Sequence, residues 1–171
     1  ISDYLVAFAK EHGFDYVQDE MNNVIIYKPA TPGYENAPTV ILQGHMDMVC
    51  EKRHDVQHDF EKDGLNLSVK DGYVTANGTT LGGDDGIAVA YALALLDSTD
   101  LPHPALEVLI TVDEEIGLLG AVGLDCSVLK GKRMINMDSE AEGSLWISCA
   151  GGLSAVSHIP VARVDAEGEK L

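Results

Sequence analysis

The chain has 171 residues, of which 46% are hydrophobic, and this length allows one globular domain with a substantial core. Its formal net charge of −17 argues against a nucleic-acid partner, because binding to phosphates requires a basic surface. The sequence contains no window of about 18 uncharged apolar residues, so it predicts no transmembrane helix. We therefore expect a cytoplasmic protein without a nucleic-acid or membrane partner.

The first half of the chain predicts a helix, two strands and a hairpin. Residues 1–13 have the spacing of an amphipathic helix that stops at Gly13. Residues 22–28 and 38–44 predict short apolar strands, separated by a loop rich in Pro and Gly. Residues 65–76 predict a β-hairpin, because alternating runs flank an Asp-Gly dipeptide of the kind that type I′ turns favour.

The second half alternates strands and helices. Residues 84–96 predict a helix that is rich in Ala and apolar nearly all round, with Ile87, Tyr91 and Leu95 spaced by four, so we expect it to be buried. Further elements follow in order: a strand at 105–112, a helix at 118–125, and strands at 133–138, 144–150 and 153–164. This alternation predicts an α/β fold with a mixed, mostly parallel sheet sandwiched by helices.

The three cysteines are Cys50, Cys126 and Cys149. They are widely spaced, form no C-x-x-C pair, and each has apolar neighbours in the sequence. We therefore expect buried, reduced thiols rather than disulfides or metal ligands.

Acidic and imidazole side chains recur just beyond the predicted strands and at the start of the Ala-rich helix. They are His45 with Asp47, Asp84 with Asp85, Glu114 with Glu115, and Asp138. In open α/β sheets, ligands bind beyond the carboxyl ends of the strands. The shared position predicts that these side chains form one site.

Each cluster taken alone has an ordinary alternative. Asp84 and Asp85 are typical of a helix N-terminus, and Asp138 could open a turn. His54 and His58 are spaced for a metal pair on a helix, but no apolar face accompanies them, which favours a charged loop.

Metal-assisted hydrolysis would explain the clusters together. In an extended segment His45 and Asp47 lie on the same side, so the carboxylate can hold one imidazole nitrogen and orient the other toward a metal. Glu114 and Glu115 project differently, so one can bind a metal while the other accepts a proton from an activated water. Such a donor set suits zinc, manganese or cobalt.

Five motifs in succession, GHMDMV, TTLGGDDG, VDEEIGLLGA, NMDSE and SCAGG, resemble those of the aminoacyl-histidine dipeptidases. This is the Xaa-His, or carnosine-splitting, family of co-catalytic di-zinc metallopeptidases, and the resemblance covers nearly the whole chain. It implies hydrolysis of dipeptides such as β-alanyl-histidine by water activated between two zinc ions.

The resemblance also implies roles for individual residues. The implied metal ligands are His45, Asp84 and Asp138 for the first ion, and Asp84 and Glu115 for the second. Glu114 corresponds to the general base, and Asp47 to the neighbour that orients the histidine. The adjacent Asp85 leaves open which of the two aspartates bridges the ions.

The family has a lid domain inserted after the CAGG segment and a later closing part that supplies a final His ligand. The resemblance therefore implies an incomplete catalytic domain at 1–150 and the truncated start of a lid and dimerisation domain at 151–171. We expect a fragment that is inactive alone, from a parent that forms a homodimer through its lid.

Two alternatives remain open at this point. One is an N-acyl amino acid deacylase or desuccinylase of the same superfamily, although Asp138 favours the peptidases that accept a free amino terminus. The other is a metal-binding module without catalytic activity.

Overall fold

The computed structural model describes residues 1–139 and 141–162. The chain divides into two units, Ile1–Glu140 and Ala141–Leu171. Every helix and strand among the described residues belongs to the first unit. None of the described helices is long and apolar enough to cross a membrane.

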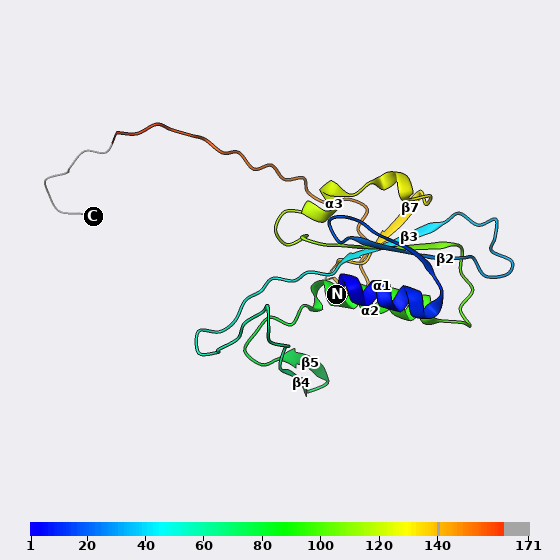
Figure 1. Cartoon of the computed structure of the whole chain (residues 1–171), viewed down its shortest axis with the longest axis horizontal. Helices are drawn as coiled ribbons and strands as arrows, with labels where there is room; N and C mark the ends of the chain where they lie inside the picture. Colours follow the sequence, from blue (N-terminus) through cyan, green and yellow to red (C-terminus); the bar gives the residue numbers. More distant parts are fainter. Residues whose placement is uncertain (140, 163–171) are drawn as a thin grey trace, which may run out of the picture. The chain divides into compact units, whose positions relative to one another are not determined.

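A five-stranded sheet forms the centre of the first unit (Figure 1). Its strands, in spatial order, are β1 (Asp15–Gln18), β2 (Val24–Lys28), β6 (Leu106–Thr111), β3 (Val40–His45) and β7 (Arg133–Asn136). The pairs β1–β2 and β2–β6 are antiparallel, whereas β6–β3 and β3–β7 are parallel. The predicted mixed α/β sheet is confirmed, with two parallel and two antiparallel pairs in place of the mostly parallel arrangement expected. The sequence did not predict β1, because four residues show too little periodicity to identify a strand.

Helices cover both faces of this sheet (Figure 1). They are α1 (Ser2–His12) and α2 (Gly83–Asp97) on one face, and α3 (Leu119–Gly123) with the 3₁₀ turn η1 (Cys126–Val128) on the other. Successive side chains of a strand point to opposite faces. Val24 and Ile26 accordingly pack with α1 and α2, while Ile25 and Leu109 pack with residues around η1.

Two predicted turns have the backbone that their residues favour. Helix α1 ends at Gly13, whose φ of 70° lies in the left-handed region that glycine adopts readily. Strands β4 (Leu67–Lys70) and β5 (Tyr73–Ala76) form the predicted hairpin. Its φ values of 52° at Asp71 and 84° at Gly72 are those of a type I′ turn.

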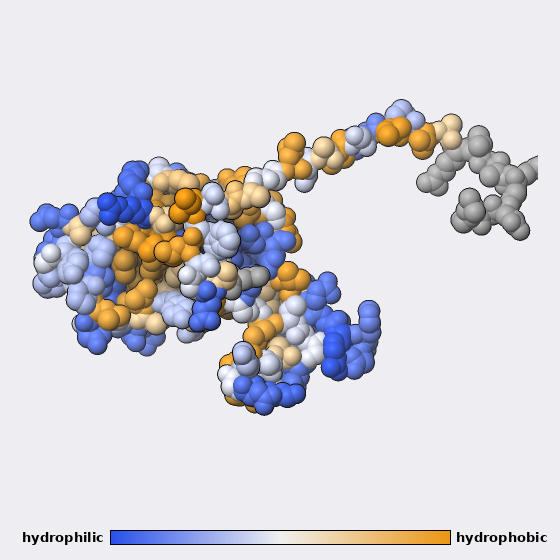
Figure 2. Space-filling view, turned by 180° about the vertical axis from the view of Figure 1, so that it is seen from behind, coloured by the Kyte–Doolittle hydropathy of each residue, from blue (hydrophilic) through white to orange (hydrophobic). Residues whose placement is uncertain are grey.

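Helix α2 buries only one side. Ala88, Ala92 and Leu96 are at most 1% exposed, whereas Ile87 and Tyr91 are 54% and 61% exposed. The expectation of a helix buried all round is therefore wrong, because a uniformly apolar composition does not determine which sides find a neighbour. Figure 2 likewise shows hydrophobic residues on the surface of the first unit.

Two predicted strands do not form among the described residues. Residues 144–150 and 153–162 contain neither helix nor strand, and positions 163 and 164 of the second prediction lie outside the described residues. Leu145 and Ile147 are 97% and 101% exposed. An apolar, β-branched pattern becomes a strand only where a neighbouring strand supplies hydrogen bonds, and no described segment pairs with these residues.

The expectation of buried thiols is also wrong. Cys50, Cys126 and Cys149 are all exposed, and none of them forms a disulfide. The expectation relied on apolar neighbours in the sequence, which indicate burial only where the segment itself packs against a core.

Candidate active site

The parallel strands bring the predicted site residues to one edge of the sheet. Strand β3 ends at His45, which is in register with the last residue of β6, so Glu114 and Glu115 follow at the same edge. Asp138 comes two residues after β7, which runs parallel to β3 on its other side. Helix α2, which packs against β3, supplies Asp84 from its first turn.

His45 lies at the centre of this site, with a side chain that is 1% exposed. Its Nε2 lies 2.9 Å from Asp84 Oδ1 and 3.9 Å from Glu114 Oε2. Its Nδ1 lies 3.3 Å from Asp47 Oδ1, without hydrogen-bond alignment, and both atoms are buried without another partner. One ring nitrogen thus faces Asp47, and the other faces Asp84 and Glu114.

Asp85 has surroundings that the sequence did not predict. It is 2% exposed, and its Oδ2 accepts a hydrogen bond from the backbone N–H of His45 at 3.2 Å. Gly44 permits this approach, since a Cβ there would lie 2.5 Å from Asp85 Oδ2 and 2.6 Å from the Cβ of Ala88. The glycine before His45 is the sequence signal that could have indicated a close approach of helix and strand.

Asp47 connects two parts of the site. Its Oδ1 faces the ring of His45, and its Oδ2 accepts a hydrogen bond from the backbone N–H of Glu115 at 3.2 Å. One carboxylate therefore contacts both the imidazole and the acidic segment after β6. The second contact depends on the packing of β3 beside β6, so the sequence did not reveal it.

Two groups of potential metal ligands share His45. One contains His45, Asp85 and Asp138, and the other contains His45, Asp84 and Glu115. Within each group, one ligand atom of each residue lies within 4.8 Å of the others. A cavity of about 200 Å³, lined in part by Asp84, Asp85 and Asp138, adjoins them.

Burial and like charge shift the pKa values of two site residues. Burial raises the pKa of Glu114, and the carboxylates of Asp138 and Glu115 raise it further against the opposing influence of His45. Burial disfavours the charged form of His45, but the hydrogen bond with Asp84 and the other nearby carboxylates outweigh burial and raise its pKa. Among the described residues, no Lys or Arg forms an ion pair with these carboxylates. The site therefore carries a surplus of negative charge.

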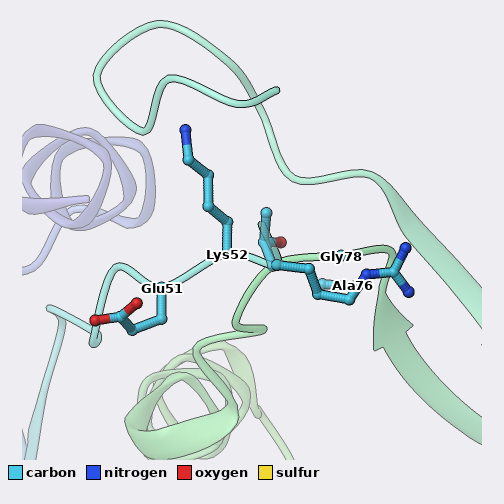
Figure 3. A pocket seen from close by; sticks show the side chains of 6 residues that line it. Glu51, Lys52, Ala76 and Gly78 are labelled. Atoms are coloured by element: carbon cyan, nitrogen blue, oxygen red, sulfur yellow. The ribbon is translucent and has the colours of Figure 1, made fainter. Parts of the chain in front are cut away.

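A second hollow, of about 420 Å³, lies between the loop after β3 and the end of β5 (Figure 3). It is lined by Glu51, Lys52, Arg53, Ala76, Gly78 and Thr79. Its cations already have partners, because Lys52 Nζ donates to the carbonyl of His58 and Arg53 pairs with Asp55. His54 and His58 lie in this loop, as the sequence predicted, and not on a helix.

Comparison with known proteins identifies the family. The family described as Peptidase family M20/M25/M40 matches residues 41–144, a span that contains every predicted site residue. The chain belongs to this peptidase family.

Relatives of this M20-family chain include dipeptidases. The chain is 45% identical over 163 residues to the cytosol non-specific dipeptidase of Escherichia coli (strain K12), and the alignment covers 95% of the chain and 34% of that protein. The crystal structure of aminoacylhistidine dipeptidase from Vibrio alginolyticus has a TM-score of 0.80 and 49% identity, covering 83% of this chain and 29% of that one. The structure of aminopeptidase PepT from Bacillus cereus has a TM-score of 0.64 and 30% identity, covering 81% of this chain and 37% of that one.

These comparisons confirm the family resemblance inferred from the motifs. The chain spans about a third of the length of these relatives.

The donor atoms of this M20-family site fit a divalent metal ion. Imidazole and carboxylate ligands in combination suit zinc, manganese and cobalt. The site offers the ring of His45 and carboxylates on several sides. The buried Nδ1 of His45 and Oδ1 of Asp47 lie 3.3 Å apart and lack another partner, so Asp47 is placed to orient the ring. A bound cation would neutralise the surplus charge and fix the tautomer of the histidine.

Proposed function

We propose that the natural protein hydrolyses dipeptides of the Xaa-His type, such as β-alanyl-histidine, at a centre of two zinc ions. The observation that carries this proposal is that two groups of potential metal ligands meet at His45 at the edge of the sheet, and together they contain Asp84, Glu115 and Asp138. The names of the Escherichia coli and Vibrio alginolyticus relatives support a dipeptide as the substrate, and the Vibrio alginolyticus name supports the Xaa-His type.

We assign His45, Asp84 and Asp138 to the first ion, and Asp84 and Glu115 to the second. Asp84 suits the bridging position better than Asp85. The side chain of Asp84 is 55% exposed and faces His45 Nε2, whereas Asp85 is 2% exposed and already accepts the backbone N–H of His45. Asp85 instead fixes the backbone from which the imidazole projects.

Zinc ions bound here would polarise the scissile carbonyl and lower the pKa of a water molecule. Glu114 would accept the proton of the attacking water and deliver it to the leaving amine. Asp47 would accept the Nδ1–H of His45, so that the lone pair of Nε2 points into the site. Glu114 is suited to its role because it lies beside the proposed ligands and is not needed as one.

The test is a Glu114→Ala variant of the natural full-length protein, assayed with Xaa-His dipeptides and with N-acyl amino acids. We expect zinc content to stay the same and dipeptide hydrolysis to fall by about 10²- to 10⁴-fold, the usual contribution of a general base. Glu11→Ala, on the exposed surface of α1, is the matched control and should retain activity. Retained activity in Glu114→Ala would contradict its assigned role, and a preference for N-acyl amino acids would identify a deacylase.

The 171 residues alone should bind one zinc ion more tightly than a second. Among the described residues, the first ion has three assigned ligands and the second has Asp84 and Glu115. For the same reason we expect little peptidase activity from these residues alone. Two tightly held zinc ions per chain after dialysis would contradict this ligand assignment.

We further infer that residues 1–150 belong to a catalytic domain and that residues 151–171 begin a lid domain through which the natural protein forms a homodimer. The family resemblance supports this organisation. The name of the Escherichia coli relative supports a cytoplasmic location. Sedimentation of the full-length protein as a monomer would contradict the dimer.

A further inference from the structure

The acidic segment 112–120, which follows β6 and includes the first residues of α3, makes backbone hydrogen bonds of its own but contains two residues in an unfavourable conformation. Asp113 and Leu118 have φ values of 53° and 60°, in the left-handed region that residues with a Cβ rarely adopt. Such conformations persist where the surrounding structure holds them in place. Glu114 and Glu115 lie within this segment. Contacts that fix its backbone therefore also influence the positions of their carboxylates.

The buried side chain of Asn23 binds both ends of the segment. Asn23 directly precedes β2 and is 1% exposed. The pairing of β2 with β6 ends at Val24 and Ile110. Beyond that point the side-chain amide takes the place of a backbone partner, since Oδ1 accepts the N–H of Val112 at 3.1 Å and Nδ2 donates to the carbonyl of Gly120 at 2.9 Å.

Asp19 determines the orientation of this amide. Asn23 Nδ2 donates to Asp19 Oδ2 at 2.7 Å, and Asp19 Oδ1 accepts the backbone N–H groups of Met21 and Asn23 at 2.9 Å and 2.8 Å. An ionised carboxylate only accepts hydrogen bonds, so the NH₂ group of the amide must face Asp19. The Oδ1 atom is thereby directed toward Val112.

Gly120 packs closely against Val112 and Asn23. A Cβ at Gly120 would lie 2.3 Å from the carbonyl oxygen of Val112 and 2.6 Å from Asn23 Oδ1. The backbone N–H of Gly120 also donates to the carbonyl of Val112 at 3.1 Å. The two ends of the acidic segment are therefore joined to each other and to one side chain.

We propose that Asn23, oriented by Asp19, is a positioning residue that holds the Glu114–Glu115 segment in the metal site. Asp47 holds the middle of the segment through the N–H of Glu115, and Asn23 holds its two ends. Removal of the amide leaves a backbone donor and a backbone acceptor without a partner, which favours opening of the segment. The inference rests on the proposed function only where it concerns metal affinity.

The first measurement is amide hydrogen exchange in the 171-residue chain without metal, which does not depend on the proposed function. In Asn23→Ala, exchange should accelerate at residues 113–119 relative to the rest of the sheet. Asp19→Ala removes one partner of the amide and the acceptor of the Met21 and Asn23 N–H groups, but it keeps the amide that contacts Val112 and Gly120. It should therefore produce a smaller change at the same residues. It also keeps the test available if Asn23→Ala does not fold.

The second measurement is a cobalt(II) titration of the natural full-length protein. The affinity for the ion bound by Glu115 should fall by about 10- to 100-fold in Asn23→Ala, as is usual when a residue supporting a ligand is removed. The affinity for the ion bound by Asp138 should not change. Lys28→Met is the matched control, since Lys28 makes hydrogen bonds at the far end of α2 and none to the acidic segment.

The outcomes separate this inference from the proposed function. If Asn23→Ala loses stability as Lys28→Met does but leaves exchange at 113–119 and cobalt affinity unchanged, Asn23 is only a structural residue and the inference is wrong. If the unaltered protein binds no ion, the proposed function fails, while the exchange data still decide whether Asn23 holds the segment.

Discussion

The two ends of helix α2 differ in how many partners their charged side chains have within the chain. At the C-terminal end, Lys28 Nζ donates to the carbonyls of Leu95, Leu96 and Ser98 at 2.8, 2.9 and 2.6 Å. These are carbonyls that the end of a helix leaves without an intrahelical partner, and the negative end of the helix dipole favours a cation there. The ammonium group uses all three of its hydrogens within the chain.

At the N-terminal end, Asp84 and Asp85 add their charges to a site that already holds other carboxylates. Asp84 remains 55% exposed, and the only described side chain with which it forms an ion pair is that of His45. The Nδ1 of His45 and the Oδ1 of Asp47 lack a hydrogen-bond partner. Lys28 is thus fully hydrogen-bonded within the chain, whereas the carboxylates at the N-terminal end are not all paired within it, as expected if they bind the proposed metal ions.

Asp84→Asn should show the largest effect. We expect zinc affinity to fall by more than about 100-fold, because even the loss of a supporting residue around a metal commonly lowers affinity by 10- to 100-fold. Stability without metal should stay the same or rise, since one of several crowded negative charges is removed. Competition with a chelating dye measures the affinity, and thermal unfolding in EDTA measures the stability.

The matched control for that prediction lies at the other end of the same helix. Asp97→Asn removes an exposed carboxylate that contacts His12, and it should leave zinc affinity unchanged. Equal zinc affinity in Asp84→Asn and in the unaltered chain would show that the surplus charge at the N-terminal end does not serve a metal.

Gly44→Ala tests how closely the N-terminal end of α2 must approach β3. The added Cβ would lie 2.5 Å from Asp85 Oδ2 and 2.6 Å from the Cβ of Ala88, so the helix must shift. We expect a loss of about 1–3 kcal/mol in the free energy of unfolding, as for other overpacked sites. Urea unfolding measures this loss.

Gly86→Ala is the control on the helix itself. An added Cβ at Gly86 meets no atom within 4 Å, so this change should be neutral or should stabilise the chain by up to about 1 kcal/mol. A similar loss of stability in both variants would mean that the close contact at Gly44 is not the cause.

Lys28→Met tests the C-terminal end. The change keeps most of the apolar length of the side chain but leaves three carbonyls without their donor. We expect a loss of about 1–2 kcal/mol in the free energy of unfolding, with zinc affinity unchanged. A changed affinity would mean that the two ends of α2 are coupled, and the contrast between them would then fail.

The elements that the sequence predicted well carry their own local signals. Strand β6 is rich in apolar, strand-forming residues, α1 stops at a glycine, and the β4–β5 hairpin contains its preferred turn dipeptide. The residues that the structure brings to the sheet edge could be predicted for a related reason. Parallel strands place their carboxyl ends together, so residues that follow different strands meet without any direct signal of contact.

What the sequence could not predict depends on neighbours distant along the chain. The exposure of Tyr91 depends on what covers α2, and the roles of Asn23 and Lys28 depend on segments far away in the sequence. Asn23 in particular lies within the predicted strand 22–28, and nothing near it in the sequence indicates that its amide would meet Val112 and Gly120. Residue types and spacing indicate donors and acceptors but not their partners.

The smallest predicted effect is a pH dependence at the C-terminal end of α2. His12 Nδ1 lies 2.9 Å from the carbonyl of Phe8, and Nε2 lies 3.1 Å from Asp97 Oδ1. The Phe8 carbonyl, and the Asp97 carboxylate against opposing burial, raise the pKa of His12 above its usual 6.5. A pKa raised in the folded state means that the protonated ring stabilises the fold. This stabilisation is complete below the unfolded pKa and is lost as the pH rises through the folded one.

Thermal unfolding of the chain and of Asp97→Asn at about pH 5.5 and pH 8.5, on either side of the histidine range, measures this contribution. The unaltered chain should unfold at the higher temperature at the lower pH, and the difference between the two proteins should shrink at the higher pH. A constant difference would mean that Asp97 contributes through contacts other than protonated His12. The charge at this end of α2 would then not be paired within the chain in the way that Lys28 is.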